Sequence, residues 1–286
     1  MPISLEAEEW GLPASTTAPW LRGLDWVRRH AGHRIMLGRR AATAISRWLP
    51  PTLDTEIWPG VHVRIDLRQP VARDTWWSGR HYEAPTPAVV CRWLEHADRF
   101  FDIGANCGWY SYLALSCSSA DVYAFEPNPS LARQMNAAKS VNGLARFHPQ
   151  QLGVSNESGE LPLHGTQVDT GYSTFGPHPT LLDEGLAVPV VSFDQWRRDY
   201  GIGLPGLPSW VAKIDVEGFE PRVLQGMAES LRARAFIGLA VELNEFTLDF
   251  CGTSVGQVTQ LLAGNGYRME HRRGEERSLN RFFVPD

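Results

Sequence analysis

The sequence has little of three features that would place a protein in a special class: paired cysteines, excess positive charge and long apolar runs. Four cysteines are scattered over 286 residues without a CxxC pair, so neither a disulfide framework nor a cysteine-bound zinc site is expected. The formal net charge is −5, with 27 lysines and arginines against 32 acidic residues. Such a balance does not favour nucleic-acid binding, and we expect no nucleic-acid partner.

No segment has the pattern of a targeting signal or a membrane span. Glu6, Glu8 and Glu9 stand near the N-terminus, where a signal peptide carries positive charge. The longest clean apolar run, residues 235–241, is far shorter than the roughly 20 residues that cross a bilayer. The sequence therefore predicts a soluble, cytoplasmic protein with reduced thiols.

The first 59 residues differ in pattern from the rest of the chain. Residues 1–19 show no periodicity, whereas residues 20–49 alternate apolar and arginine side chains near helical spacing and end at a Pro-Pro pair. We predict an N-terminal arm and basic helical cap over residues 1–59 and a second domain over residues 60–286. The basic face either remains solvated while the cap packs on that domain, which we favour, or contacts an anionic surface or lipid-linked substrate.

Strands and helices alternate from residue 61 onward. Strands are expected at 61–67, 99–103, 122–125, 147–154, 188–192, 211–216, 236–243 and 281–284. Helices are expected at 88–96, 109–116, 130–142, 193–200, 220–231 and 254–264. Alternation of this kind is typical of a mostly parallel, doubly wound sheet. The predicted class is α/β, with an N-terminal helical and strand extension.

The first motif that indicates chemistry is Asp102-Ile-Gly-Ala-Asn-Cys-Gly108, which follows an apolar strand. Its glycines, Gly104 and Gly108, allow a sharp turn and close approach of a ligand, and a helix N-terminus follows. Asn106 stands where a dinucleotide loop has the middle glycine that admits a pyrophosphate. We therefore expect a ligand without a diphosphate, and S-adenosylmethionine (SAM) fits such a loop. Asp102 is expected to place the loop.

The second motif, Glu126-Pro127-Asn128, ends the next strand. Glu126 lies 18 residues after Gly108, close to the offset of about 20 at which an acid binds a ribose diol. One carboxylate can accept hydrogen bonds from both hydroxyl groups of a diol. We predict that Glu126 binds ribose and that Pro127 and Asn128 belong to the same binding turn; the alternative is a surface glutamate before a proline turn.

The third motif places Lys213, Asp215, Glu217 and Glu220 at the carboxyl end of a later strand, the edge where open parallel sheets bind ligands. Asp215 and Glu217 are predicted to orient or deprotonate an acceptor. Lys213 either binds a substrate oxygen or pairs with Asp215. Glu242 ends another strand and is predicted to face the same cleft. In the alternative, Glu217 and Glu220 stabilise only the start of the following helix.

Two further interpretations concern the surroundings of this edge. Asp215, Glu217 and Glu242 have the oxygen ligands that a divalent cation prefers; the sequence leaves this open, and we do not favour it. Trp76 and Trp77 form either an aromatic wall over the acceptor or part of the core.

In order along the chain, Asp102-Ile-Gly-Ala-Asn-Cys-Gly108, Phe125-Glu-Pro-Asn-Pro129, Ser192-Phe-Asp194 and Lys213-Ile-Asp-Val-Glu-Gly-Phe-Glu220 resemble the signatures of FkbM-type SAM-dependent methyltransferases. The resemblance covers about residues 82–243 and adds Glu83, an acid that the family often has upstream of the glycine loop, to the expected cofactor site. It also takes in the Ser/Thr stretch 171–174. It implies a class I, Rossmann-like methyltransferase fold, with SAM as cofactor.

The resemblance further implies O-methylation of a hydroxyl on a sugar, a glycosylated natural product or another secondary metabolite, so the expected partner is a small-molecule acceptor. Two alternatives stay open: an NAD-dependent oxidoreductase on a similar sheet, and a non-catalytic SAM-binding module. Asn106 argues against the first alternative. The retained acids, which include Glu126 and Asp215, argue against the second.

Overall fold

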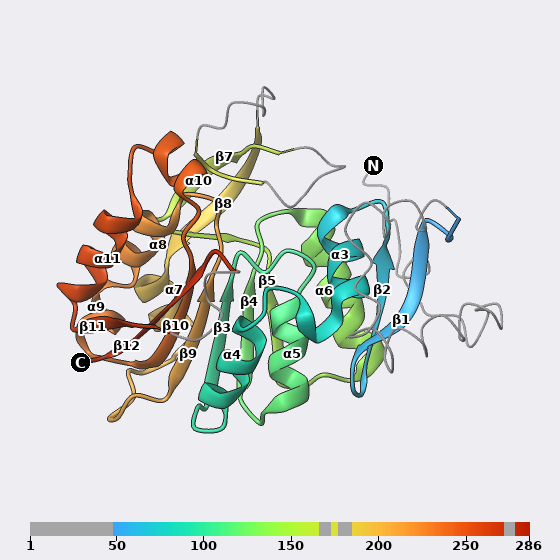
Figure 1. Ribbon diagram of the computed structural model, residues 1–286, viewed down its shortest axis with the longest axis horizontal. Helices are drawn as coiled ribbons and strands as arrows, with labels where there is room; N and C mark the ends of the chain where they lie inside the picture. The colour runs from blue at the N-terminus through green and yellow to red at the C-terminus, as the bar shows by residue number, and fades with distance from the viewer. Residues whose placement is uncertain (1–47, 166–172, 177–184, 272–277) are drawn as a thin grey trace.

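A computed structural model describes residues 48–165, 173–176, 185–271 and 278–286 of the chain (Figure 1). Within these ranges the centre is a seven-stranded sheet in the order β11-β12-β10-β9-β3-β4-β5. The strands are β11 (Tyr267–Glu270), β12 (Asn280–Pro285), β10 (Phe236–Glu242), β9 (Trp210–Ile214), β3 (Arg99–Ile103), β4 (Asp121–Phe125) and β5 (Phe147–Gln150). The pairs from β10 to β5 are parallel, and β12 is antiparallel to both of its neighbours. The predicted mostly parallel α/β sheet is confirmed.

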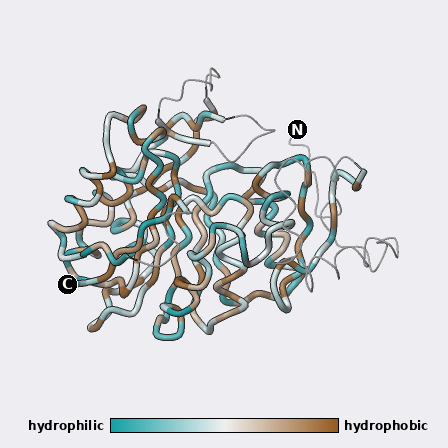
Figure 2. Tube along the Cα trace, viewed as in Figure 1, coloured by the Kyte–Doolittle hydropathy of each residue, from teal (hydrophilic) through white to brown (hydrophobic). Residues whose placement is uncertain are grey.

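Helices cover both faces of this sheet (Figure 1), and the sheet separates two hydrophobic cores. On one face lie α4 (Thr86–Leu94), α5 (Trp109–Cys117) and α6 (Pro129–Asn142); on the other lie α7 (Phe193–Asp199), α8 (Glu220–Gly226), α9 (Ala228–Arg232) and α11 (Val255–Ala263). Neighbouring residues of one strand serve different cores: Phe100 packs in the first and Phe101 in the second. Because successive side chains of a strand point to opposite faces of the sheet, one strand contributes residues to both cores. Figure 2 shows apolar residues concentrated along the central strands.

The N-terminal part of the described chain forms a hairpin and a helix beside this sheet. β1 (Thr52–Trp58) pairs antiparallel with β2 (Val61–Asp66), and α3 (Pro70–Ser78) follows. The hairpin lies against α5 and α6, and Trp58 Nε1 donates to the Trp109 carbonyl at 3.3 Å. The hairpin joins residues on both sides of position 59, where the sequence predicts a domain boundary; most of the predicted basic cap lies outside the described residues.

A smaller sheet contains β6 (Gly153–Ser155), β8 (Leu186–Ser192) and β7 (Gly159–Leu163), in that order. The strand predicted over 147–154 is therefore two strands, because the chain leaves the central sheet after Gln150. Pro149 has no backbone N–H, which suits the edge position of β5. The helix predicted over 220–231 is likewise divided at Met227.

Several short elements were not predicted from the sequence, among them β1, α3, α10 (Glu245–Phe250) and β11.

None of the helices in the described ranges combines the length and the apolar character that a membrane span requires.

Candidate active site

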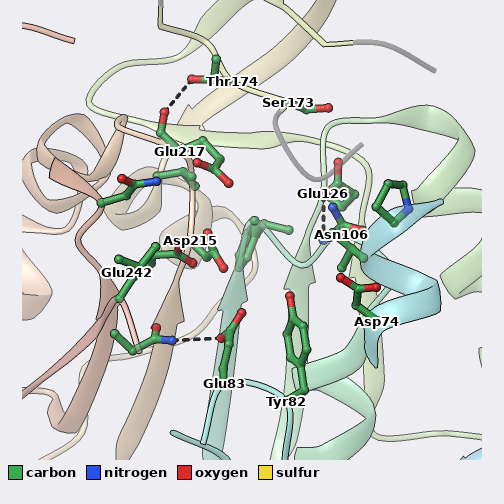
Figure 3. Close-up of a pocket in the computed structure, with 18 of the residues that line it drawn as sticks. Asp74, Tyr82, Glu83, Asn106, Glu126, Ser173, Thr174, Asp215, Glu217 and Glu242 are labelled. Atoms are coloured by element: carbon green, nitrogen blue, oxygen red, sulfur yellow. Dashed lines mark hydrogen bonds between the residues drawn. The ribbon is translucent and has the colours of Figure 1, made fainter. Parts of the chain in front are cut away.

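A pocket of about 860 Å³ opens at the carboxyl edge of the central sheet (Figure 3). Its lining includes residues that follow four parallel strands: Gly104 and Asn106 after β3, Glu126 and Pro127 after β4, Asp215 and Glu217 after β9, and Glu242 and Asn244 at β10. Further lining comes from α3 and the turn after it, the segment 173–175, the small sheet (Gly153, Val154 and Leu163) and residues 278–280. The volume is near the top of the range for small-molecule sites, about 300–1,000 Å³.

The glycine loop after β3 is shaped by close packing. Gly104 has φ +81°, and a Cβ there would lie 1.8 Å from the carbonyl oxygen of Asp215. Gly108 also has φ +81°, and a Cβ there would lie 3.1 Å from the side chains of Met135 and Tyr112. Both positions therefore require glycine for the backbone conformation and for contacts within the protein. Gly104 lines the pocket; Gly108 is not among the described lining residues.

The amide groups of this loop are engaged inside the protein. The N–H groups of Gly104 and Ala105 donate to the Phe125 carbonyl, and that of Gly108 donates to the Ala105 carbonyl. The Asn106 N–H donates to Glu126. Because these amides already have acceptors, the loop is poorly suited to hold a diphosphate, which agrees with the departure of its sequence from the dinucleotide pattern.

Glu126 is buried at the end of β4 with both carboxylate oxygens held by backbone amides. Oε2 accepts from Asn106 N–H and Oε1 from Asn128 N–H, each at 2.8 Å. Burial raises the pKa of Glu126 to about 7, although the two amide donors favour the ionised form. Each oxygen keeps a second lone pair, so the side chain can still accept two hydrogen bonds from a ligand. Asn128 caps α6 by accepting from Ser130 N–H at 2.9 Å and lies outside the described lining.

Lys213 lies fully buried in β9 and pairs with the acids at the neighbouring strand ends. Its Nζ donates to Asp215 Oδ2 at 2.9 Å and lies 4.0 Å from Glu242 Oε2. Nζ also lies 5.3 Å from the centroid of the Tyr110 ring. Two roles were predicted for Lys213, and the pairing with Asp215 is the one observed. The side chain is not part of the described lining, so it is not placed to bind a substrate oxygen.

The charges of this group depend on one another. Burial acts to raise the pKa of Asp215, but the Lys213 ammonium lowers it below its ordinary value. Burial and the charge of Asp215 raise the pKa of Glu242 well above its usual range. Burial acts to lower the pKa of Lys213, but the negative charges of Asp215 and Glu83 outweigh burial and raise the pKa above its ordinary value. At neutral pH, Asp215 is therefore ionised and Lys213 is charged, and Glu242 holds a proton more tightly than a free glutamate does.

Glu83 completes an acidic group at this end of the pocket. Its Oε2 accepts from Tyr110 Oη at 2.8 Å. The same oxygen accepts from Asn280 Nδ2 at 2.9 Å (Figure 3). Carboxylate oxygens of Glu83, Asp215 and Glu242 lie within 4.8 Å of one another. The acids considered for a cation from sequence included Glu217, whereas the group that the structure brings together has Glu83. The neighbouring lysine ammonium already supplies positive charge here.

Glu217 faces the pocket from the turn after β9. Within the described part of the chain its buried Oε2 has no hydrogen-bond partner, and its carbonyl accepts from Thr174 Oγ1 at 2.9 Å (Figure 3). Burial, Asp215 and Glu220 raise the pKa of Glu217 to about 9, so it holds a proton at neutral pH. Glu220 instead accepts from two amides of the preceding turn, each at 3.2 Å, as expected for a residue that stabilises a helix start.

With this geometry established, comparison with known families identifies the chain. The family model described as methyltransferase FkbM domain matches residues 102–269. The chain belongs to the FkbM methyltransferase family. Family membership and the doubly wound, mostly parallel sheet together confirm the predicted class I methyltransferase fold. Membership also favours methyl transfer over the hydride transfer considered from sequence.

One relative of this FkbM methyltransferase has a named activity. The hexuronic acid methyltransferase AglP of Haloferax volcanii is 27% identical over 169 residues. The match covers 59% of this chain and 63% of AglP, so the chain spans less than two thirds of that relative.

Solved structures show a weaker likeness. A SAM-dependent methyltransferase from Agrobacterium tumefaciens has a TM-score of 0.39 and 11% identity, over 83% of this chain and 71% of its own. The mitomycin 7-O-methyltransferase MmcR has a TM-score of 0.38 and 15% identity, over 94% of this chain and 69% of its own. At scores this low, the fold class rests on the strand order and the family.

Two residues singled out in the FkbM methyltransferase sequence act away from the pocket surface. Asp102 is buried, and its Oδ2 accepts from Ser111 Oγ at 2.6 Å, which links β3 to α5; burial raises the pKa of Asp102 to about 6. Trp76 is fully buried, with Nε1 donating to Thr55 Oγ1 at 3.3 Å. Trp76 and Trp77 are absent from the described lining, so the aromatic-wall interpretation is wrong and the packing alternative holds.

Several lining residues carry no recognisable signal in the sequence. Arg73 and Asp74 come from α3, a helix without a side-chain cap. Asn280 opens β12 and reaches Glu83 across 197 positions. Such residues meet the motif residues only through the tertiary fold, and no local spacing marks them.

Proposed function

We propose that this FkbM-family protein uses SAM to methylate a hydroxyl group of a sugar, a glycosylated natural product or a related secondary metabolite. The observation that carries the proposal is the presence in one pocket of Glu126, with lone pairs available to a diol, and Asp215, an ionised carboxylate. The relative named as a hexuronic acid methyltransferase supports a sugar acceptor.

The described residues suit SAM by their charge and by their hydrogen-bonding groups. Glu126 would hold the ribose diol, and Asn106, Pro127 and Gly104 line the same pocket. Six carboxyl side chains line the pocket, which suits a cofactor that carries a sulfonium and an ammonium group. When bound, SAM supplies an electrophilic methyl group on a good leaving group. A volume of about 860 Å³ also leaves room for an acceptor.

The protein's own task is alignment and removal of one proton. Holding two reactants in line contributes about 7–11 kcal/mol to barrier lowering, whereas a general base contributes about 10²–10⁴-fold. Asp215 is the proposed hydrogen-bond acceptor for the acceptor hydroxyl and receives its proton. Because Lys213 keeps Asp215 a weak base, we assign most of the rate enhancement to alignment. Glu217, protonated at neutral pH, donates a hydrogen bond to an oxygen in the pocket.

The test is incubation of the purified protein with isotopically labelled SAM and a panel of uronic acids and glycosylated natural products. We expect label transfer to a hydroxyl of at least one sugar, measured by mass spectrometry. Glu126→Ala should weaken binding of S-adenosylhomocysteine by about 10- to 100-fold, as expected for loss of charge-assisted hydrogen bonds. Glu157→Ala, at an exposed glutamate, is the matched control. Equal affinity in Glu126→Ala and wild type would refute the ribose assignment.

A further inference from the structure

The pocket contains one described basic side chain of the lysine or arginine type. Six acids line it: Asp74, Glu83, Glu126, Asp215, Glu217 and Glu242. Among the lining residues in the described ranges, Arg73 of α3 is the sole arginine, and there is no lysine. Among the described lining residues, Arg73 is therefore the arginine or lysine side chain with which a negatively charged ligand can pair.

One donor of the Arg73 guanidinium has no hydrogen-bond partner in the described structure. Its Nε is buried without such a partner, and the contact with Asp74 Oδ1 is an ion pair at 3.4 Å. Two other arginines differ: Arg64 and Arg68 donate through two nitrogens to the carboxylates of β1 and β2, at 2.7–2.9 Å for the shorter bonds. The guanidinium of Arg73 thus keeps a donor for an acceptor in the pocket, and its side chain is 15% exposed.

Four backbone amides of the glycine loop are already engaged within the protein. The N–H groups of Gly104, Ala105, Asn106 and Gly108 all donate to acceptors there. In many nucleotide sites such amides receive the negative group. Because these four amides have acceptors, we look to the Arg73 side chain for that role.

We propose that Arg73 binds the carboxylate of a ligand in this pocket, an inference that rests on the proposed function. A guanidinium matches a carboxylate with two parallel N–H···O bonds. The reaction offers two sources of this group: the methionyl carboxylate of SAM, and the carboxylate of a uronic acid acceptor. Both have the same chemistry, and the experiment distinguishes them.

The cofactor arm measures binding by calorimetry. S-Adenosylhomocysteine carries the amino-acid carboxylate, and 5′-methylthioadenosine has the same adenosine and thioether without it. If Arg73 binds the cofactor carboxylate, Arg73→Gln weakens the binding of S-adenosylhomocysteine by about 10- to 100-fold and leaves the affinity for methylthioadenosine unchanged. Arg68→Gln, at an arginine paired with Asp66 outside the described lining, is the matched control.

The acceptor arm measures methyl transfer at saturating SAM to glucuronic acid and to glucose. If Arg73 binds the acceptor carboxylate, Arg73→Gln raises KM for glucuronic acid by about 10- to 100-fold and leaves glucose and both cofactor analogues unchanged. Arg73→Lys keeps the charge but loses the paired donors, so it should recover part of the affinity in whichever arm responds.

The outcomes separate the two proposals. No change beyond that of Arg68→Gln in either arm overturns the role of Arg73, even if the wild type is an active methyltransferase. A wild type that binds neither analogue refutes the proposed function itself. If Arg73→Gln weakens both analogues equally, Arg73→Lys decides: selective recovery of S-adenosylhomocysteine supports carboxylate binding, and equal loss of both analogues overturns it.

Discussion

The two ends of the pocket hold their carboxyl groups in different ways. At the end of β4, Glu126 is fixed by two backbone amides, which are neutral and belong to the fold. At the ends of β9 and β10, Asp215 and Glu242 lie beside the Lys213 ammonium, which lowers the pKa of Asp215, while burial raises the pKa of Glu242. An amide-held carboxylate keeps its place whatever enters the pocket, whereas a charge network redistributes protons when a new charge arrives. The first arrangement suits binding and the second suits proton handling.

The largest effect should come from removing the ammonium on which the charged end depends. Lys213→Met leaves Asp215 and Glu242 buried without their counter-ion, so we expect a loss of about 3–5 kcal/mol in the free energy of unfolding, measured with urea. Lys139→Met, in the last turn of α6, is the control and should lose less than about 1 kcal/mol. A loss equal to that of the control would show that the network does not stabilise the fold.

A smaller effect is expected from neutralising the proposed proton acceptor. Asp215→Asn should lower kcat by about 10²-fold, roughly 3 kcal/mol, while the affinity for S-adenosylhomocysteine stays within about twofold of wild type. Glu242 can then ionise beside Lys213, which limits the loss of stability. The contrast with Glu126→Ala is the sharpest check, because that variant should lose affinity. If both variants change the same parameter, the division between the two ends is wrong.

The smallest effect is a pH dependence at Glu217. Its pKa is raised from 4.5 to about 9, so the folded state binds this proton more tightly than the unfolded chain. The resulting stability is present below about pH 4.5 and is lost as the pH rises toward 9. Glu217→Gln should therefore gain about 1 kcal/mol relative to wild type between pH 5 and pH 6, measured by urea unfolding at both values. Glu157→Gln should show no such gain. If the difference in unfolding free energy between Glu217→Gln and wild type is the same at both pH values, the raised pKa of Glu217 is contradicted.

The motif residues could be placed from sequence because each directly follows a buried strand. Asp102, Glu126, Asp215 and Glu242 stand at or just beyond the ends of parallel strands, and parallel strands end at one edge of the sheet. Family membership and the α/β sheet were predicted for the same reason, since both depend on local patterns in sequential order.

The surroundings of these residues could not be placed in this way. Glu83 was expected from resemblance alone, and its partner Asn280 comes from an antiparallel strand far along the chain. Arg73 lies on a short helix whose burial depends on the β1–β2 hairpin. For Lys213, two roles were equally compatible with the sequence, because the choice depends on which side of β9 the ammonium contacts acidic side chains.

The position of β12 has a consequence for how the protein is made. This strand lies between β10 and β11 although it follows both in sequence, and its first residue holds Glu83 from 197 positions away. On the ribosome, a nascent chain that has formed the glycine turn and every preceding parallel strand still lacks one support of its acidic group. The hydrogen bond from Asn280 to Glu83 thus forms only after translation has delivered β12, which inserts between two strands already made.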